Sequence, residues 1–248
     1  GLIALALLVA LSAPVFAELQ NVEVGGSLRI RGNVWEMDKA VTMGDLAFSE
    51  MRTRLNVKAD FTDEVSAFIE LDSYDVMGED FRSNYVLGLD ARAASGDDVE
   101  MYQAYIEAKD LYGTALSLRV GRQEIQLGSE WLVGNNDKNS FFTGLSFDAI
   151  RLDYATDMFS VTALASKLAE TFGDFADNDA DLYGIYASYL GIEDVTIDAY
   201  WLWVRDRVAL IGTESDLHTV GLRGAGTLGA FDFDAEVAYQ FGEAEFPD

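Results

Sequence analysis

From Val22 onward, apolar residues recur at every second position, which is the period of a β-strand with one apolar and one polar face. The first such segment covers residues 22–34 (VEVGGSLRIRGNV), and helical spacing is absent from almost the whole chain. We therefore predict an all-β protein. Its eleven expected strands lie near 22–35, 50–61, 65–73, 99–109, 115–123, 147–154, 159–166, 182–190, 195–205, 217–226 and 231–241.

The connections between these strands alternate in length. Short turns lie at 62–64, 111–114, 155–158, 191–194 and 228–230, and long loops lie at 37–48, 74–98, 124–146, 167–181 and 206–216. Outer-membrane β-barrels combine short periplasmic turns with long external loops, and their strands of about 10 residues face lipid on one side and a polar interior on the other. The pattern predicts a transmembrane antiparallel β-barrel whose first strand starts on the periplasmic side.

Aromatic residues near strand ends are the second sign of a membrane wall. Aromatic girdles of outer-membrane barrels lie at the two bilayer interfaces. We expect such girdles to contain Tyr102, Tyr154, Phe159, Tyr200, Trp201, Trp203, Phe231, Tyr239 and Phe241.

Composition excludes several other classes. The 248 residues are 50% hydrophobic and 12% aromatic with two prolines, which is too apolar for a disordered acidic chain. Seventeen basic residues against 43 acidic ones, with a formal net charge of -26, exclude nucleic acid as a partner. The absence of cysteine excludes disulfide scaffolds and thiolate metal sites. Long loops such as 75–98 hold much of the negative charge.

The first seventeen residues, GLIALALLVALSAPVFA, form an uncharged apolar run that ends in Val15-Phe16-Ala17. Such a run, with small residues before the expected cleavage point, is typical of a secretory signal peptide. It is too short to cross about 30 Å of hydrocarbon. We predict a signal peptide at 1–17 that lacks its basic n-region, followed by the barrel wall from 18 to 248.

The most specific strings lie between residues 102 and 152. They are YQAYIE at 102–107, GRQE at 121–124, LVG at 132–134 and FDAIRL at 147–152, followed later by TVGLR at 219–223 and AEVAYQFG at 235–242. In this order and spacing, the chain from about Val22 to Gly242 resembles the alginate export family of outer-membrane β-barrels.

The resemblance implies a barrel of eighteen strands around a polar pore in the outer membrane of a Gram-negative-type bacterium. Since eleven strands are readable, we expect the chain to be the N-terminal part of that barrel, without roughly seven C-terminal strands. The implied function is a porin or channel for a hydrophilic solute, either an acidic polysaccharide or small anions. The alternative is a non-transport surface or structural barrel or, below it, a barrel hydrolase. Expected partners are outer-membrane lipid, lipopolysaccharide and periplasmic secretion proteins, and no cofactor is expected.

Most of the basic residues lie on the polar faces of the strands, which we assign to the pore. The strand with Arg29 and Arg31 is expected to pair with the strand that carries Arg52 and Arg54. Two interpretations remain open: these guanidinium groups contact a passing anion, or they pair with acids such as Glu50 and stiffen the wall. The candidate pore cations are Arg29, Arg31, Arg52, Arg54, Lys58, Lys109, Arg119, Arg122, Arg151 and Arg223.

Arg122 and Gln123 end a strand, and we expect them either to order the following long loop or to form part of a constriction. An enzyme is not expected. The single histidine, His218, is assigned to the lipid face or its rim, and no motif supports Ser215 and Asp216 as its catalytic partners. The acidic stretch at 174–181 lacks the glycine and terminal glutamate of a Ca²⁺ loop, so no metal site is predicted.

Overall fold

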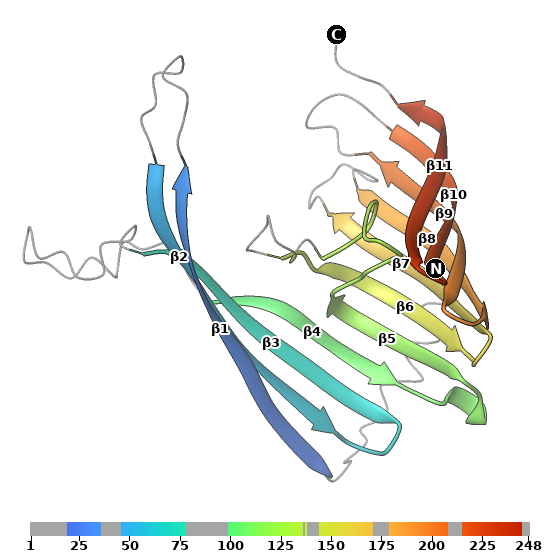
Figure 1. The fold of residues 1–248 in the computed structure, drawn as a ribbon. Helices are drawn as coiled ribbons and strands as arrows, with labels where there is room; N and C mark the ends of the chain where they lie inside the picture. The colour runs from blue at the N-terminus through green and yellow to red at the C-terminus, as the bar shows by residue number, and fades with distance from the viewer. Residues whose placement is uncertain are drawn as a thin grey trace, which may run out of the picture.

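A computed structural model describes residues 19–35, 46–77, 99–135, 137, 144–170, 179–207 and 215–244. The predicted signal peptide at 1–17 lies outside these residues, as does most of the acidic stretch at 174–181. Within them, eleven strands form one antiparallel sheet in sequence order (Figure 1), which confirms the all-β prediction. The strands are β1 (Asn21–Trp35), β2 (Leu46–Asp60), β3 (Val65–Val76), β4 (Glu100–Ala108), β5 (Leu116–Gln123), β6 (Phe147–Ala155), β7 (Phe159–Ala169), β8 (Ala180–Ile192), β9 (Val195–Asp206), β10 (Ser215–Leu228) and β11 (Phe231–Ala244).

The sheet curves into an open trough, with β1 and β11 at its two edges (Figure 1). The only helical element among the described residues is the one-turn 3-10 helix η2 (Leu111–Gly113) between β4 and β5. None of the described helical residues forms a helix long and apolar enough to span a membrane. The structure is thus the curved wall of a barrel, and its closure by seven further strands stays a prediction.

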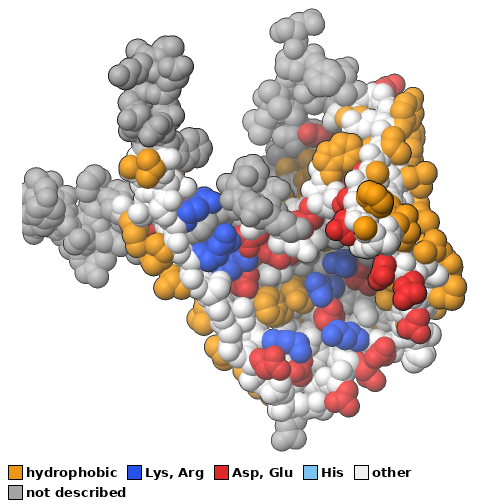
Figure 2. All heavy atoms as spheres, in the orientation of Figure 1, with side chains coloured by type: hydrophobic (Ala, Val, Ile, Leu, Met, Phe, Trp, Pro, Cys, Tyr) orange, Lys and Arg blue, Asp and Glu red, His pale blue; other side chains and the backbone are white. Residues whose placement is uncertain are grey.

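Side chains on the two faces of the wall differ as the alternation predicts. On the convex face of β1, Val24, Leu28 and Ile30 are 69%, 62% and 60% exposed, as expected for side chains that meet lipid. Arg29 and Arg31, at the alternate positions of the strand, lie on the concave face, where Figure 2 shows lysines, arginines and acids gathered across the hollow of the trough. The polar side of the wall is therefore the concave side.

Part of the concave face is apolar, because the chain after β5 folds into the trough. Ile125, Leu127 and Val133 of this inward segment, residues 124–135, are buried at 0%, 8% and 7% exposure. They pack on inward side chains of β7 to β9, which include Leu164 and Leu182. Because burial of apolar surface contributes about 25 cal/mol per Å², this packing stabilises the inward segment against the wall. The uniformly polar pore face expected from the sequence is thus interrupted here.

A row of charged residues crosses the convex face at the loop-side ends of β5 to β11. Each member is the direct cross-strand partner of the next, and basic and acidic residues alternate along six of the seven strands. Nitrogen–oxygen distances are 2.7 Å for Arg122–Asp148 and 2.8 Å for Lys167–Asp181. This convex charge row consists of Arg122, Asp148, Lys167, Asp181, Arg205, Asp216 and Glu243.

The row explains why several strands extend beyond their predicted ends. Strand β8 begins at Ala180 instead of 182, and β10 begins at Ser215 instead of 217. The prediction stopped where the apolar alternation stopped, whereas the backbone pairing continues through the charged residues.

Four aromatic rings stack across neighbouring strands, two residues nearer the turn end of each strand than the convex charge row. They belong to Tyr183, Trp203, His218 and Phe241, and successive ring centroids are 5.0–5.5 Å apart. This is the arrangement expected of an interface girdle.

Candidate functional site: the concave wall and its inward segment

The pairing of β1 with β2 gathers three arginines on the concave face. Arg29 lies directly opposite Arg52, and Arg54 follows two residues further along β2. Like charges directly opposite each other are destabilising unless acids lie between them. Asp72 of β3 supplies one such acid: its Oδ2 lies 2.7 Å from Nη2 of Arg52 and 3.1 Å from Nε of Arg54. Arg52 is 2% exposed, so this ion pair is screened little by water.

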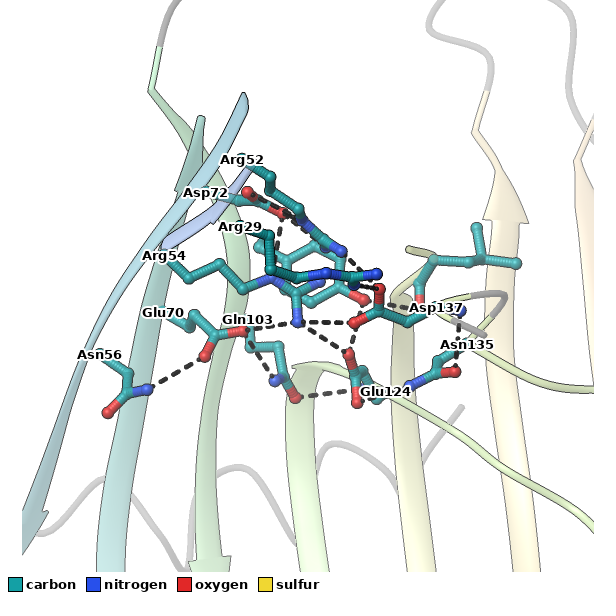
Figure 3. A network of polar contacts seen from close by, with 12 residues as sticks. Arg29, Arg52, Arg54, Asn56, Glu70, Asp72, Gln103, Glu124, Asn135 and Asp137 are labelled. Atoms are coloured by element: carbon teal, nitrogen blue, oxygen red, sulfur yellow. Dashed lines mark hydrogen bonds and ion pairs between the residues drawn. The ribbon is translucent and has the colours of Figure 1, made fainter. Parts of the chain in front are cut away.

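A second carboxylate reaches the arginines from a distant part of the chain. Oδ1 of Asp137 accepts hydrogen bonds of 2.7 Å from Arg29 Nη1 and of 2.7 Å from Arg52 Nη1, and its Oδ2 accepts one of 3.3 Å from Arg54 Nη1. Figure 3 shows this carboxylate in front of the strands, with all three guanidinium groups directed at it. The arginine cluster, defined as Arg29, Arg52 and Arg54, therefore holds a carboxylate that does not belong to its own strands.

A bulge in β4 adds an aromatic ring to the cluster. Between Glu70 and Leu71 of β3 the register shifts, so that Gln103 and Met101 are the paired residues and Tyr102 is the extra one. Bulges redirect side chains in this way. The guanidinium carbon of Arg54 lies 3.8 Å from the ring centroid of Tyr102. The prediction that Tyr102 belongs to the interface girdle was wrong, since its ring is 8% exposed on the concave side.

Tyr200 is a second aromatic residue that lies outside the predicted girdle. It is 6% exposed, stacks on Tyr186 at 5.5 Å and donates a 2.8 Å hydrogen bond to Glu236. Both rings lie beneath the inward segment. Because the segment supplies an apolar cover at this position, large rings on the concave face are shielded from water instead of meeting lipid.

Acids outnumber the arginines of the cluster. In addition to Asp72 and Asp137, Glu70 and Glu124 lie 3.6 and 3.5 Å from Nη1 of Arg54. Glu124 is also held by hydrogen bonds from Tyr102 and from Asn135, at 2.6 and 3.0 Å. Three arginines therefore share four carboxylates. The cluster is saturated with acids, which the parity of the strands alone did not reveal, because Glu124 and Asp137 lie after β5.

The remaining predicted pore cations, apart from Arg122, also lie on the concave face, each beside a carboxylate. Arg223 is bound by two acids, Asp198 and Asp234, at 2.8 and 2.7 Å. The other pairs are Arg31–Glu50 at 2.6 Å, Lys58–Asp60 at 2.9 Å, Lys109–Glu107 at 3.4 Å, Arg119–Glu107 at 2.7 Å and Arg151–Asp153 at 2.9 Å. Each of these cations thus forms an ion pair, as the second interpretation expects, and their contact with a passing anion stays a prediction.

Arg122 is on the opposite face from the other predicted cations. Its cross-strand partner is Asp148, which it binds through two hydrogen bonds of 2.7 and 2.9 Å on the convex side. The odd spacing between Arg119 and Arg122 accounts for this, because residues three apart in a strand point to opposite faces. Gln123 orders the inward segment instead: it is 0% exposed, and its Nε2 donates to the carbonyl oxygen of Ala149 at 3.1 Å.

The inward segment and Asp137 together cross the trough. At one end Ser129 donates a 2.9 Å hydrogen bond to Glu236 of β11, and at the other Asp137 contacts β1 and β2. Next to Ser129, Gly128 adopts a φ of 56°, close beneath the hydroxyl of Tyr186, with which a Cβ at this position would collide. A segment that joins both edges of the wall narrows the path along the concave face.

The residues considered for catalysis do not converge. His218 and Asp216 lie on the convex face, whereas Ser215 has the opposite parity. His218 stacks between Trp203 and Phe241, and its Nε2 is 3.8 Å from Asp216. Among the described residues, no group of three or more His, Cys, Asp or Glu side chains has the arrangement of a metal site.

Comparison with known proteins shows which family the chain belongs to. The model of the family described as alginate export matches residues 20–246. The chain belongs to the alginate export family. Family membership makes it a channel or transporter of the Gram-negative outer membrane, and points to transport instead of catalysis.

Solved structures of porins are also similar to the chain. Two mutants of the Rh. blastica porin are each 12% identical to it, with TM-scores of 0.41 and 0.42. Each alignment covers 88% of this chain and 84% of the porin chain. No curated protein matches the chain.

Proposed function

We propose that the chain forms part of the wall of an outer-membrane channel that passes a hydrophilic solute bearing carboxylates, such as an acidic polysaccharide. The observation that carries this proposal is the binding of Asp137 by Arg29, Arg52 and Arg54. This carboxylate comes from outside the strands and is held at 2.7 to 3.3 Å on the concave face. The planar guanidinium fork suits any carboxylate that approaches along the same path.

Because the arginines of the cluster already have carboxylate partners, the cluster suits the passage of an acidic solute better than its tight binding. A solute must bind strongly enough to enter a pore and weakly enough to leave it. Since each guanidinium group already has acidic partners, a passing carboxylate gains a contact only by exchange with a contact of similar strength. The proposal therefore expects brief, weak contacts with an acidic solute.

We also propose which molecules and proteins surround the wall in the outer membrane. Outer-membrane lipid covers the apolar convex face, and lipopolysaccharide surrounds the convex charge row on the loop side. Residues 18–248 are the N-terminal part of the barrel, residues 1–17 direct its secretion and are removed, and periplasmic secretion proteins deliver the solute to the turn side.

The first test is a planar-bilayer measurement on the full-length protein in a salt gradient. We expect ohmic conductance, and we expect Arg52→Ala combined with Arg54→Ala to move the reversal potential toward the value for cations, because two positive groups leave the concave face. Arg29→Gln, whose side chain is 41% exposed, is a milder change that should move it in the same direction. No conductance would refute a channel, and an unchanged reversal potential in both variants would refute the role of the arginines.

Asp137→Asn provides the opposite change at the same place. It removes one negative charge without removing an arginine, so the reversal potential should move toward the value for anions. Asp234→Asn is the matched control, because Asp234 also binds a concave arginine but lies on β11, away from the cluster. A larger shift in the control than in Asp137→Asn would contradict the proposed role of the cluster as the main contact for charged solutes on the concave face.

A further inference from the structure

The bulge in β4 places two neighbouring side chains, Tyr102 and Gln103, on the same concave face. In an undisturbed strand successive side chains point to opposite faces, so Tyr102 would face lipid while Gln103 faces the pore. With the bulge, Gln103 and Met101 are the paired residues, and the extra residue, Tyr102, turns inward and is buried. Bulges beside functional sites redirect side chains in this way. The bulge therefore brings to the concave face a ring that a regular strand would turn outward.

Both residues of this bulge hold Glu124, the first residue of the inward segment. The hydroxyl of Tyr102 donates a 2.6 Å hydrogen bond to Oε1 of Glu124. The amide oxygen of Gln103 accepts one of 3.1 Å from the backbone N–H of the same residue. Hydrogen bonds to a carboxylate are stronger than those between neutral groups. The position of the Glu124 carboxylate therefore depends on Tyr102 in particular.

Residues that lead into β6 also lie against Tyr102. The carbonyl oxygen of Leu145 is 3.4 Å from the tyrosine hydroxyl. Gly144 lies so close that a Cβ at this position would be 2.5 Å from that hydroxyl, and 2.7 and 2.8 Å from the Nη2 atoms of Arg52 and Arg54. The chain just after β5 and the chain just before β6 thus meet at one side chain beside the arginine cluster.

The ring of Tyr102 supports Arg54 at the same time. The guanidinium carbon of Arg54 lies 3.8 Å from the ring centroid, and its Nη2 is buried without a hydrogen-bond partner among the described residues. The aromatic face stabilises this cation through the ring quadrupole. Nη1 of Arg54 is 3.5 Å from Oε1 of Glu124, and Figure 3 shows the two side chains directed at each other. Tyr102 therefore contacts both members of this ion pair, the acid with its hydroxyl and the base with its ring.

We propose that Tyr102 is a positioning residue that sets the ion selectivity of the channel through Glu124, although it carries no charge itself. The inference rests on the proposed function, because it requires the arginine cluster and its acids to face the conducting path. With the hydroxyl in place, Oε1 of Glu124 is bound by a donor. Without it, the carboxylate keeps only the 3.0 Å hydrogen bond from Asn135 to its other oxygen, and more of its negative charge acts on passing ions.

The test measures the reversal potential of the full-length protein in a planar bilayer under a salt gradient. Tyr102→Phe keeps the ring beneath Arg54 and removes only the hydroxyl. The reversal potential should move toward the value for cations, by less than in Arg52→Ala with Arg54→Ala, because no formal charge is lost. Tyr105→Phe is the matched control and should leave it unchanged, because its ring lies on the same strand beneath Arg119, at 4.4 Å, outside the cluster.

A double-mutant cycle separates action through Glu124 from a merely structural role of Tyr102. Glu124→Gln removes the carboxylate, so adding Tyr102→Phe to it should leave the reversal potential where Glu124→Gln alone places it. A structural tyrosine would cause the same shift in both backgrounds, and that result would refute the proposal. A Tyr102→Phe channel with an unchanged reversal potential, or one moved toward the value for anions, would refute it as well. Absence of conductance in the wild type would refute the proposed channel instead.

Discussion

The arginine cluster and the convex charge row arrange their charges in opposite ways. On the concave face, Arg29 lies opposite Arg52, so like charges meet across β1 and β2. On the convex face, Arg122 lies opposite Asp148 and Lys167 opposite Asp181, so opposite charges meet. Both regions use similar side chains on strands of one sheet. They differ in where the neutralising acid originates.

The convex row is complete within the sheet, because each basic residue finds its acid on the neighbouring strand. The arginine cluster is complete only with Asp137, which lies 85 residues from Arg52 in the chain. Convergence of like charges carries a cost that a purely structural ion-pair network avoids by alternation. This difference supports the proposed role of the arginine cluster as a contact surface for acidic groups. It also supports a purely structural role for the convex charge row.

The largest expected effect concerns the buried member of the cluster. Arg52→Leu removes a side chain that is 2% exposed and leaves Asp72 and Asp137 with fewer cationic partners. Removal of one partner from a buried ion pair costs about 3–5 kcal/mol. Unfolding by denaturant in phospholipid vesicles should show this loss of stability. A loss below about 1 kcal/mol would mean that the cluster contributes no more than a surface pair.

A somewhat smaller effect is expected from a charge added to the apolar part of the convex face. Leu222 lies midway along β10 between Asp216 of the row and Leu228 at the turn end, and it is 58% exposed. Leu222→Arg should cost about 2–4 kcal/mol if that position lies near the bilayer midplane. Gln240→Arg on the concave side of β11 is the control and should change stability by about 0.5 kcal/mol or less. Equal losses would contradict the assignment of the convex face to lipid, and a larger loss in Gln240→Arg would show that the two faces have been assigned in reverse.

The smallest effect is expected in the convex row. Arg122 and Asp148 have side chains 44% and 52% exposed, and exposed ion pairs contribute about 0.2–1 kcal/mol. Arg122→Gln should therefore change the free energy of unfolding by less than about 1 kcal/mol. It should also leave the reversal potential unchanged, because this side chain does not face the pore. A shift as large as that of Arg52→Ala with Arg54→Ala would place Arg122 on the conducting path.

The strands and their faces could be predicted from the sequence because period-two alternation is a local property. The pairing of the strand that carries Arg29 with the strand that carries Arg52 and Arg54 followed from their succession in the chain, and the polar parity placed these arginines on one face. Arg122 could have been assigned to the lipid side by the same rule, since an odd separation from Arg119 reverses the face.

The features that could not be predicted from the sequence depend on contacts between segments that are distant in the chain. Nothing in the local pattern indicated that Tyr102 would be the extra residue of a bulge, or that Ile125 would be buried inside the trough. Asp137 was one acid among many in a long loop, and its contact with Arg52 is visible only after the inward segment has folded back. The shared carboxylates of the cluster therefore required the three-dimensional structure.

The convex charge row also constrains how the sheet can form. Because side chains alternate in a strand, a slip of one residue would turn a row member such as Lys167 toward the water-filled side and an apolar neighbour outward. A slip of two residues would keep the faces but would place Lys167 opposite Tyr183 instead of Asp181. Misaligned hairpins thus lose an ion pair at the point where each strand leaves the hydrocarbon. The row thereby favours one alignment of successive hairpins during insertion.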